Sequence, residues 1–315
     1  MEQKKKLFAV AGPTASGKTA LAVSLAHRLE GEVISNDSMQ IYMGMTIGTA
    51  APTQAEMEGT PHHMIAAVPP TEDFSCADYA EMAVPVVEDV LARGRVPIFC
   101  GGTGLYLDAV LYGNGLSDST KNPAVRACFE AVAREQGADA LHGLLAAVDP
   151  ASAAAIHPNN VRRVIRALEI YETTGIPKSR YDGLTPAADA KYDCTRIVLS
   201  FQSRELLYER IDRRVEGMMQ AGLLREVTGL YEAGLLQEDK PAFQAIGYKE
   251  FLPYFSGAYT LEQVVEEICR NTRRYAKRQI TWFKRYPDAV VVSVDKQGQM
   301  RPTEELAEEI CERIG

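Results

Sequence analysis

Residues 12–19 carry the clearest chemical information in the sequence. They fill every fixed position of the pattern G-x-x-x-x-G-K-[ST], the P-loop, whose glycines let backbone N–H groups and a helix N-terminus face a phosphate. Lys18 adds a positive charge, and Thr19 offers a hydroxyl to Mg²⁺. The pattern predicts a site for a phosphorylated ligand without identifying that ligand. The predicted phosphate-binding residues are Gly12, Pro13, Thr14, Ala15, Ser16, Gly17, Lys18 and Thr19.

Two polar residues that follow other predicted strands are candidates for catalysis. Asp37 comes directly after an apolar run, and a carboxylate beside a phosphate site can hold Mg²⁺ or take a proton from a nucleophile. Asp37 with Gln40 three residues later also fits a helix capping box. Thr103 lies in Gly101-Gly-Thr-Gly104, which also fits a plain turn between a strand and a helix. This loop lacks the acidic residue expected at the end of the metal-binding strand of an ATPase, which weakens an ATP-hydrolysing interpretation.

Two arginines further along the chain can also meet phosphate. Arg210 and Arg214 are four residues apart in a segment of helical pattern, so they share one helix face. A guanidinium group matches phosphate oxygens in a bidentate way, which suits a diphosphate. The alternative is a solvent-exposed face on which these arginines interact with neighbours such as Glu209. The sequence leaves both interpretations open.

The segment from Arg270 to Arg285 holds seven basic residues and no acidic one, with aromatic residues such as Tyr275 and Trp282 between them. This composition is typical of a surface that binds RNA or phosphate. Neutralisation by the glutamates at positions 262, 266 and 267 is the alternative. A second, smaller basic group lies within Asn160–Arg166.

The candidate residues lie at the ends of predicted strands. Short apolar runs predict strands at 7–11, 32–35 and 96–100, and strand character returns only once, at 195–201. Helices are predicted at 20–29 and at 79–93. Strands that alternate with helices indicate a parallel sheet, in which ligands bind beyond the carboxyl ends of the strands. The P-loop, residues 36–38 and residues 101–104 are therefore expected to meet in one crevice.

The region between the last two predicted strands has a different character. Residues 123–174 are rich in alanine and helical in pattern, and they contain no predicted strand. We therefore expect an α/β fold in which a P-loop NTPase-like parallel sheet is flanked by helices and carries a helical insertion at 117–194. The catalytic core would comprise residues 1–116 and 195–315, including the C-terminal helices.

The composition is that of an ordinary soluble protein, with 46% hydrophobic and 24% charged residues in a chain of 315. A net charge of −8 argues mildly against a nucleic-acid partner, apart from the basic segments. No stretch reaches transmembrane length, and the first apolar run is too short for a signal peptide. The six cysteines form no C-x-x-C pair, so neither zinc nor disulfides are expected and the predicted location is the cytoplasm. His62 and His63 are predicted to be structural.

The ordered motifs resemble those of the tRNA dimethylallyltransferases, also called tRNA isopentenyltransferases, over nearly the full chain. The resemblance rests on the motifs at 12–19, 34–42, 47–50, 73–79, 101–106, 157–169, 244–249 and 272–285. Two positions depart from the family pattern. Thr46 stands where the family usually has an acidic residue, and Ala51 stands where it usually has a basic one.

The resemblance implies a reaction. Dimethylallyl diphosphate would donate its five-carbon group to the exocyclic amine of the adenosine on the 3′ side of the tRNA anticodon, and diphosphate would leave. The P-loop, Arg210 and Arg214 would hold the diphosphate, with Mg²⁺ at Thr19. In the family, the residues that match Asp37 and Thr103 contact the target adenine, and Asp37 would act as the base. The adenine must leave its stack to reach them.

The resemblance also implies a binding surface for the tRNA anticodon stem-loop, formed by the basic segment and the insertion. It implies no membrane and no protein partner, so a monomer is expected. The residues expected to contact tRNA are Asp37, Ser38, Met39, Gln40, Thr103, Arg126, Val161, Arg162, Arg163, Val164, Ile165, Gln244, Gly247, Lys249, Arg274, Lys277, Arg278 and Lys284.

Three alternatives share part of this pattern. A phosphotransferase of the nucleotide-kinase type would share the P-loop and the sheet but would not need the basic segment. A P-loop switch that binds RNA without catalysis would hydrolyse GTP or ATP, which the missing acidic strand end disfavours. An isopentenyltransferase that acts on free adenine nucleotides would lack much of the RNA-binding surface.

Overall fold

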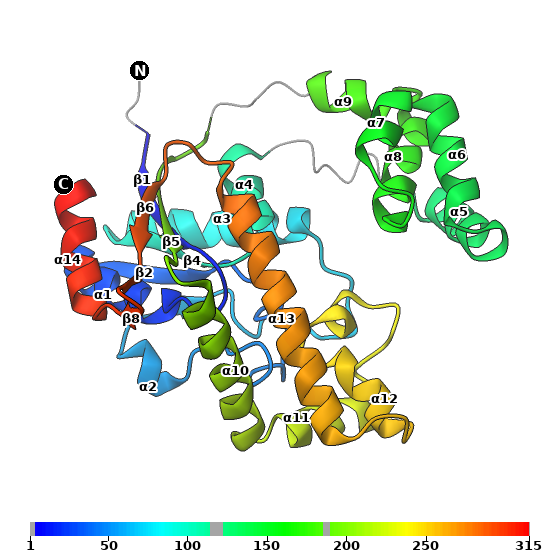
Figure 1. Cartoon of the computed structure of the whole chain (residues 1–315). Helices are drawn as coiled ribbons and strands as arrows, with labels where there is room; N and C mark the ends of the chain where they lie inside the picture. Colours follow the sequence, from blue (N-terminus) through cyan, green and yellow to red (C-terminus); the bar gives the residue numbers. More distant parts are fainter. Residues whose placement is uncertain (1–3, 114–121, 185–189, 315) are drawn as a thin grey trace. The chain divides into compact units, whose positions relative to one another are not determined.

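The structure, a computed structural model, describes residues 4–113, 122–184 and 190–314, and it divides the chain into two compact units (Figure 1). The first unit comprises Met1–Leu111 and Ala190–Gly315, and the second comprises Tyr112–Asp189. The predicted insertion, 117–194, covers much of the second unit. Its last five residues, 190–194, belong instead to the first unit, where strand β5 begins at Asp193.

A six-stranded parallel sheet forms the centre of the first unit, which confirms the predicted α/β fold. The strands lie in the order β3-β2-β4-β1-β5-β6, and every neighbouring pair is parallel. The chain connects β1 to β2 on one side of β1, and it later connects β4 to β5 on the other side. The loop after β1 therefore lies where the direction of the connections reverses, which is where ligands bind in such sheets. The strands are β1 Lys6–Ala11, β2 Gly31–Ser35, β3 His62–His63, β4 Val96–Gly101, β5 Asp193–Ser200 and β6 Val290–Ser293.

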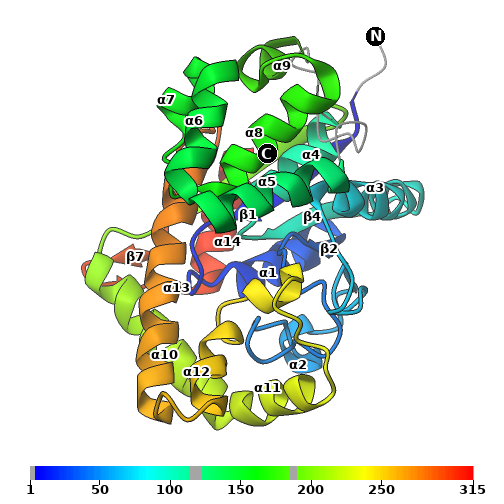
Figure 2. The ribbon, with the colours of Figure 1, turned by 90° about the vertical axis from the view of Figure 1, so that its right-hand side faces the viewer.

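Helices cover both faces of this sheet (Figure 2). On one face, α1 (Lys18–Leu29) and α14 (Thr303–Ile314) lie side by side and enclose buried side chains such as Phe8, Leu25 and Ile310. On the other face lie α3 (Cys76–Ala92) and α4 (Gly104–Tyr112). Because both faces are covered, β1, β2 and β4 are buried almost throughout, as is usual for parallel strands.

Two strands differ from the sequence predictions. His62 and His63 form the short edge strand β3, paired with Val33 and Ile34 of β2. Val290–Ser293 forms β6 at the opposite edge, so the prediction that strand character returns only at 195–201 was wrong. Both are edge strands of four residues or fewer, and such short runs give little periodic signal in a sequence.

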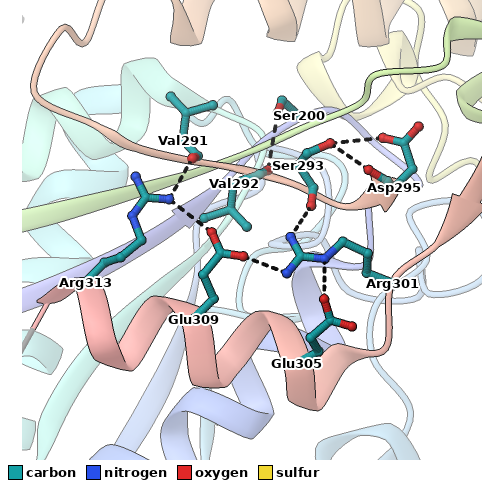
Figure 3. Close-up of polar contacts among 9 residues, drawn as sticks. All are labelled: Ser200, Val291, Val292, Ser293, Asp295, Arg301, Glu305, Glu309 and Arg313. Atoms are coloured by element: carbon teal, nitrogen blue, oxygen red, sulfur yellow. Dashed lines mark hydrogen bonds and ion pairs between the residues drawn. The ribbon is translucent and has the colours of Figure 1, made fainter. Parts of the chain in front are cut away.

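The C-terminal segment fastens β6 to α14 through a group of polar contacts (Figure 3). Between these elements, β7 (Asp295–Lys296) and β8 (Gln299–Met300) form an antiparallel hairpin. Arg301 donates to the carbonyl of Ser293 and forms ion pairs with Glu305 and Glu309 of α14. These contacts attach helix α14 to the short edge strand β6.

The same segment fixes the start of α10 (Arg204–Gln220). The carboxylate of Asp295 is fully buried and accepts hydrogen bonds from the backbone N–H groups of Gln202 (2.7 Å) and Ser203 (2.8 Å). Ser203 in turn caps α10 by accepting from the N–H of Leu206. The direction of α10 is therefore set by groups at its first turn.

The remaining part of the first unit is helical. The helix α13 (Leu261–Phe283) packs against α10, and Ala276 of α13 and Ile211 of α10 are buried against Ala15 of the P-loop. Two long helices thus lie directly on the phosphate-binding loop. The other elements are α2 Gln54–Met57, α11 Leu223–Glu232, α12 Leu252–Phe255 and the 3-10 turns Pro241–Gln244 and Lys249–Phe251.

The second unit is helical and has a core of its own. Leu141, Leu145, Val164 and Leu168 are buried together in it. The fully buried carboxylate of Glu169 is balanced by ion pairs with two arginines, at positions 126 and 166, and by the N–H of residue 122. Its helices are α5 Pro123–Gln136, α6 Ala138–Val148, α7 Pro150–Ala155, α8 Val161–Thr174 and α9 Lys178–Leu184.

Across both units, no helix within the described residues is long and apolar enough to cross a membrane.

Candidate active site

A pocket of about 490 Å³ opens in the first unit beyond the carboxyl ends of β1, β2 and β4. The three loops that were predicted to converge do so here, since P-loop residues, residues 37–40 and Gly101 all line it. Residues 48–50, Glu56, residues 244–249 and one side each of α10 and α13 complete the lining. A pocket of this size suits a small phosphorylated substrate together with part of a second reactant.

The P-loop lines the pocket from Thr14 to Ala20, whereas Gly12 and Pro13 do not line it. Gly12 is packed so closely on β5 that an added Cβ would lie 2.9 Å from the carbonyl oxygen of Leu199. The hydroxyl of Ser16 is buried without a hydrogen-bond partner among the described residues. A buried polar atom of this kind normally has a partner, so Ser16 is suited to a phosphate oxygen.

Lys18 is half-buried in the pocket, and its Nζ donates a hydrogen bond to the carbonyl of Pro13 at 2.8 Å. Burial lowers the pKa of Lys18 to about 8, and the nearby guanidinium of Arg214 acts in the same direction. Cys100 and Asp37 act in the opposite direction. Burial therefore disfavours the charged ammonium group, and a bound anion would offset this unfavourable free energy.

Asp37 lies in the pocket with one carboxylate oxygen engaged and one free. Its Oδ1 accepts hydrogen bonds from the N–H groups of Met39 (2.9 Å) and Gln40 (3.4 Å), while Oδ2 has no hydrogen-bond partner among the described residues. The alternative interpretation as a helix capping box was wrong. No helix follows Asp37, and the Gln40 amide bonds to Ser35 and to the carbonyls of Thr49 and Ala50.

Thr103 stands beside this loop but does not itself line the pocket. Its Oγ1 accepts from the N–H of Ser38 at 3.1 Å, and its N–H donates to the carbonyl of Asn36. The side chain of Asn36 donates back to the carbonyl of Thr103. Thr103 therefore ties the loop after β4 to the loop that carries Asp37.

The glycines around Thr103 are required by the close approach of other segments. A Cβ at Gly101 would lie 2.0 Å from the backbone oxygen of Asn36, and one at Gly102 would lie 1.9 Å from the amide of Gln279. A Cβ at Gly104 would lie 2.0 Å from the indole nitrogen of Trp282. The loop is thus a tight turn, as the alternative interpretation of the sequence held, and the turn lets α13 reach the crevice.

Arg210 and Arg214 both line the pocket and are half-buried, so they do not form a solvent-exposed face. Arg210 Nε donates to the carbonyl of Ala15 in the P-loop at 2.8 Å. Neither arginine forms an ion pair with a carboxylate among the described residues. Burial lowers the pKa of each guanidinium, and the charge of Asp37 partly opposes this for Arg214. Two positive charges therefore face the P-loop without a carboxylate partner.

The basic residues of α13, together with its C-cap residue Lys284, fall into two groups. Arg270 pairs with Glu267 and Arg273 pairs with Asp212 of α10, so these two arginines are neutralised locally. The side chains of Arg274, Lys277, Arg278 and Lys284 are exposed and form no ion pair within the part of the chain that the structure describes.

Arg278 differs from the other three because it also lines the pocket, beside the ring of Tyr275. We call these four exposed basic residues the exposed stripe. The stripe therefore reaches the pocket at Arg278.

The other predicted tRNA contacts are distributed unevenly. Gln244 and Lys249 line the pocket. Gly247 is buried with its N–H bound to Glu250, so it forms a turn and offers no side chain to RNA.

In the second unit, Val164 and Ile165 are 0% and 4% exposed, so these two predictions were wrong. Both residues belong to the apolar face of α8. Val161 is partly buried against that core, whereas Arg162 and Arg163 are exposed.

Gln279 and Glu226 were missed by sequence reasoning. Gln279 is buried, accepts from the N–H of Thr14 at 2.8 Å and donates to the carbonyl of Gly102 at 3.2 Å, so it joins the P-loop to the loop after β4. Its position four residues before the buried Phe283 was the available signal, because it places an amide on the inner face of α13. Glu226 gave no signal, since its partners are distant in the sequence.

Comparisons with known proteins agree with this geometry. The family model described as IPP transferase matches residues 40–286. A tRNA dimethylallyltransferase of Halalkalibacterium halodurans is 48% identical, and the match covers 89% of this chain and 88% of the relative. One from Roseiflexus castenholzii is 47% identical, with coverage of 95% and 96%.

This chain belongs to the IPP transferase family.

Solved structures of the family have the same fold. A full-length tRNA isopentenylpyrophosphate transferase from Bacillus halodurans superimposes with a TM-score of 0.70 at 44% identity, covering 99% of this chain and 97% of that one. A eukaryotic dimethylallyltransferase described as acting on tRNA superimposes with a TM-score of 0.82 at 31% identity, covering 98% of this chain and 79% of that one. The predicted family is thereby confirmed.

Proposed function

We propose that this protein is a tRNA dimethylallyltransferase that prenylates the exocyclic amine of the adenosine on the 3′ side of the anticodon. The observation that carries the proposal is the content of one pocket. It combines a P-loop, two arginines without carboxylate partners and an aspartate with a free carboxylate oxygen. The P-loop and the arginines suit a leaving diphosphate, and the aspartate suits an amine nucleophile.

The diphosphate would lie on the P-loop. Backbone N–H groups at the start of α1, the Ser16 hydroxyl and Lys18 would bind its oxygens from one side. Arg210 and Arg214 would bind them from the side of α10 and absorb the charge that grows as the carbon–oxygen bond breaks. Because these groups are already partly buried, their attraction for the anion is stronger than it would be in water.

Mg²⁺ fits this site as a partner of the substrate. The Thr19 hydroxyl lines the pocket, and the described residues include no group of three or more acidic, His or Cys side chains that would hold a metal by themselves. Thr19 would therefore contribute one ligand, and diphosphate oxygens and water would contribute the others, as is common for this ion. When bound, Mg²⁺ neutralises charge on the diphosphate.

The transfer step balances with one base. The adenine amine forms a bond to the first carbon of the dimethylallyl group, and the bond from that carbon to the diphosphate oxygen breaks. The amine loses one proton, which Oδ2 of Asp37 accepts. Thr103 would act by holding the loop after β2 in place, since its hydroxyl binds the N–H of Ser38.

The exposed stripe of α13 would bind phosphates of the anticodon stem-loop. Arg274 and Lys277 of that helix and Lys284 at its C-cap are exposed without carboxylate partners among the described residues, and Arg278 extends the stripe to the pocket. We propose a second contact at Arg162 and Arg163 of the second unit. A monomer in the cytoplasm stays a prediction from the sequence.

The test is direct. Purified protein is incubated with Mg²⁺, unmodified tRNA and dimethylallyl diphosphate labelled in its carbon chain, and the digested RNA is examined for a prenylated adenosine. Label in that nucleoside is the expected result. Transfer to free AMP in place of tRNA would assign the protein to the enzymes of free nucleotides, and phosphate transfer from ATP without prenylation would assign it to the kinases.

A further inference from the structure

Glu226 lies on α11, outside the residues that line the pocket, yet its carboxylate is bound to a loop that does line it. Oε2 accepts hydrogen bonds from Thr46 N (3.0 Å), Thr46 Oγ1 (2.8 Å) and Ile47 N (2.8 Å). Oε1 accepts from Gly48 N (3.1 Å) and from the hydroxyl of Tyr248 (2.7 Å). One carboxylate therefore satisfies three consecutive backbone N–H groups and two hydroxyls.

The loop that Glu226 binds continues into one wall of the pocket, formed by Gly48, Thr49 and Ala50. Ala50 has a φ of 48°, a left-handed conformation that a residue with a side chain adopts only where its surroundings enforce it. Gly48 lies against Tyr248 so closely that a Cβ there would be 2.5 Å from the ring. Contacts from outside the loop thus fix its conformation.

This wall is connected to the proposed base. The carbonyls of Thr49 and Ala50 accept hydrogen bonds from Gln40 Nε2 at 3.3 and 3.1 Å. The other end of the same amide accepts from Ser35 Oγ at 2.8 Å, and the backbone N–H of Gln40 donates to Asp37 Oδ1. The position of the wall therefore sets the orientation of Gln40, which in turn borders Asp37.

We propose that Glu226 is a positioning residue for the transfer reaction, an inference that rests on the proposed function. Its carboxylate fixes the turn at 46–48, the turn fixes the carbonyls of Thr49 and Ala50, and these hold Gln40 beside Asp37. A wall fixed before substrates bind keeps the base in a productive geometry, which transfer between two bound reactants requires. Thr46, one of the two departures from the family pattern, contributes its hydroxyl to this arrangement.

The test compares Glu226→Gln with Glu232→Gln, an exposed glutamate on the same helix that has no hydrogen bond or ion pair among the described residues. In Glu226→Gln an amide nitrogen, which cannot accept hydrogen bonds, replaces one carboxylate oxygen, so at least one N–H of the turn loses its acceptor. We expect kcat for tRNA prenylation to fall about tenfold or more. Amide hydrogen exchange at residues 46–48 should accelerate, while the Kd values for magnesium pyrophosphate and tRNA stay within about twofold. Glu232→Gln should leave all four measurements unchanged.

Tyr248→Phe and Thr46→Val keep the proposal testable if Glu226→Gln does not fold. Each removes one hydroxyl donor from the carboxylate, so each alone should lower kcat by less than the roughly tenfold loss expected for Glu226→Gln. If Glu226→Gln does fold, adding either change to it should lower kcat by less than the same change does in the wild-type protein. Faster exchange at 46–48 with a full kcat would overturn the proposal. Equal losses of kcat and pyrophosphate binding would also overturn it, because they would indicate a general structural role.

The result for the wild-type protein separates this inference from the proposed function. If the wild-type protein prenylates no tRNA, the proposed function fails and the positioning role fails with it, since no transfer remains to be positioned. Amide exchange would then report only whether Glu226 fixes the turn. If the wild-type protein is active, the variants alone decide the role of Glu226.

Discussion

The side chains that face the proposed diphosphate site are partly buried, and burial disfavours their charged forms. Burial lowers the pKa of Lys18, Arg210 and Arg214, and a bound anion raises the pKa of each again. Because the arginines stay protonated at any ordinary pH, Lys18 is the member of the set whose charge changes within a measurable range. The pocket is therefore prepared for an anion, and one of its contributions can be followed by titration.

Pyrophosphate affinity is expected to fall above the pKa of Lys18. The free protein has this pKa at about 8, and the anion binds the protonated form and raises it. The contribution of Lys18 is therefore complete below about pH 8 and declines up to about tenfold per pH unit above it. The measurement is the Kd for magnesium pyrophosphate from about pH 6.5 to about pH 9.5, for the wild-type protein and Lys18→Ala. The ratio of the two Kd values at each pH cancels the effect of the ionisation of pyrophosphate itself. A ratio that stays constant up to the highest pH would contradict the role of Lys18 in binding the anion.

Asp37→Asn should lower kcat roughly a hundredfold or more, because an amide cannot take the proton that the adenine amine loses. The Asn oxygen can still accept from Met39 N–H, so the loop should keep its shape. Pyrophosphate and tRNA affinities should therefore change little, and thermal melting checks the fold. An unchanged kcat with a lower melting temperature would show that Asp37 serves only the turn at 37–40.

At this scale the sequence could predict the residue types but not all of their surroundings. The P-loop, Asp37 and the arginine pair follow from local patterns, because spacing along a strand end or a helix determines them. Gln279 and Glu226 act on segments that lie more than 170 residues away along the chain, as their bonds to Thr14 and Thr46 show. No local pattern encodes such pairs.

Among the elements, α13 does more than its sequence indicated. Its basic composition predicts an RNA-binding helix, but Gln279 and Trp282 on its inner side also contact the glycine-rich loop after β4. The sequence predicted that three loops converge, because strand ends meet at one edge of a parallel sheet. It could not predict that α13 forms a further wall, since helix packing depends on tertiary contacts.

Charge reversal on α13 should therefore separate two functions. Arg274→Glu with Lys277→Glu, both exposed, should weaken tRNA binding and lower its salt slope by about two units, while pyrophosphate binding stays the same. Arg278→Glu should weaken both, because this side chain also lines the pocket. Lys4→Glu with Lys296→Glu, which are exposed elsewhere in the first unit, controls for net charge. Equal effects of the two double variants on tRNA would remove α13 from the binding surface.

At the scale of the whole molecule, the proposed function requires an acidic protein to bind RNA through limited basic surfaces. The net charge of −8 argued against a nucleic-acid partner, but that total averages over solvated acidic faces and a few unpaired basic groups. The sequence did predict two parts to the chain, because the alanine-rich helical pattern differs from the alternating α/β pattern. It could not predict which residues of α8 face outward, and it assigned two core residues, Val164 and Ile165, to RNA.

The second unit offers a test in which affinity and stability respond to different arginines. Arg162 and Arg163 are exposed on α8 and form no ion pair among the described residues, so changing both to Glu should reduce tRNA affinity and leave the melting temperature nearly unchanged.

Arg126 instead balances the buried carboxylate of Glu169. Arg126→Ala should lower the stability of this unit, with a moderate effect because Arg166 still pairs with the same carboxylate. The measurements are the Kd for tRNA and thermal unfolding of each variant. Full tRNA affinity in the Arg162 and Arg163 double variant would show that the second unit does not bind RNA through α8, and that α13 and the rim of the pocket supply the contacts.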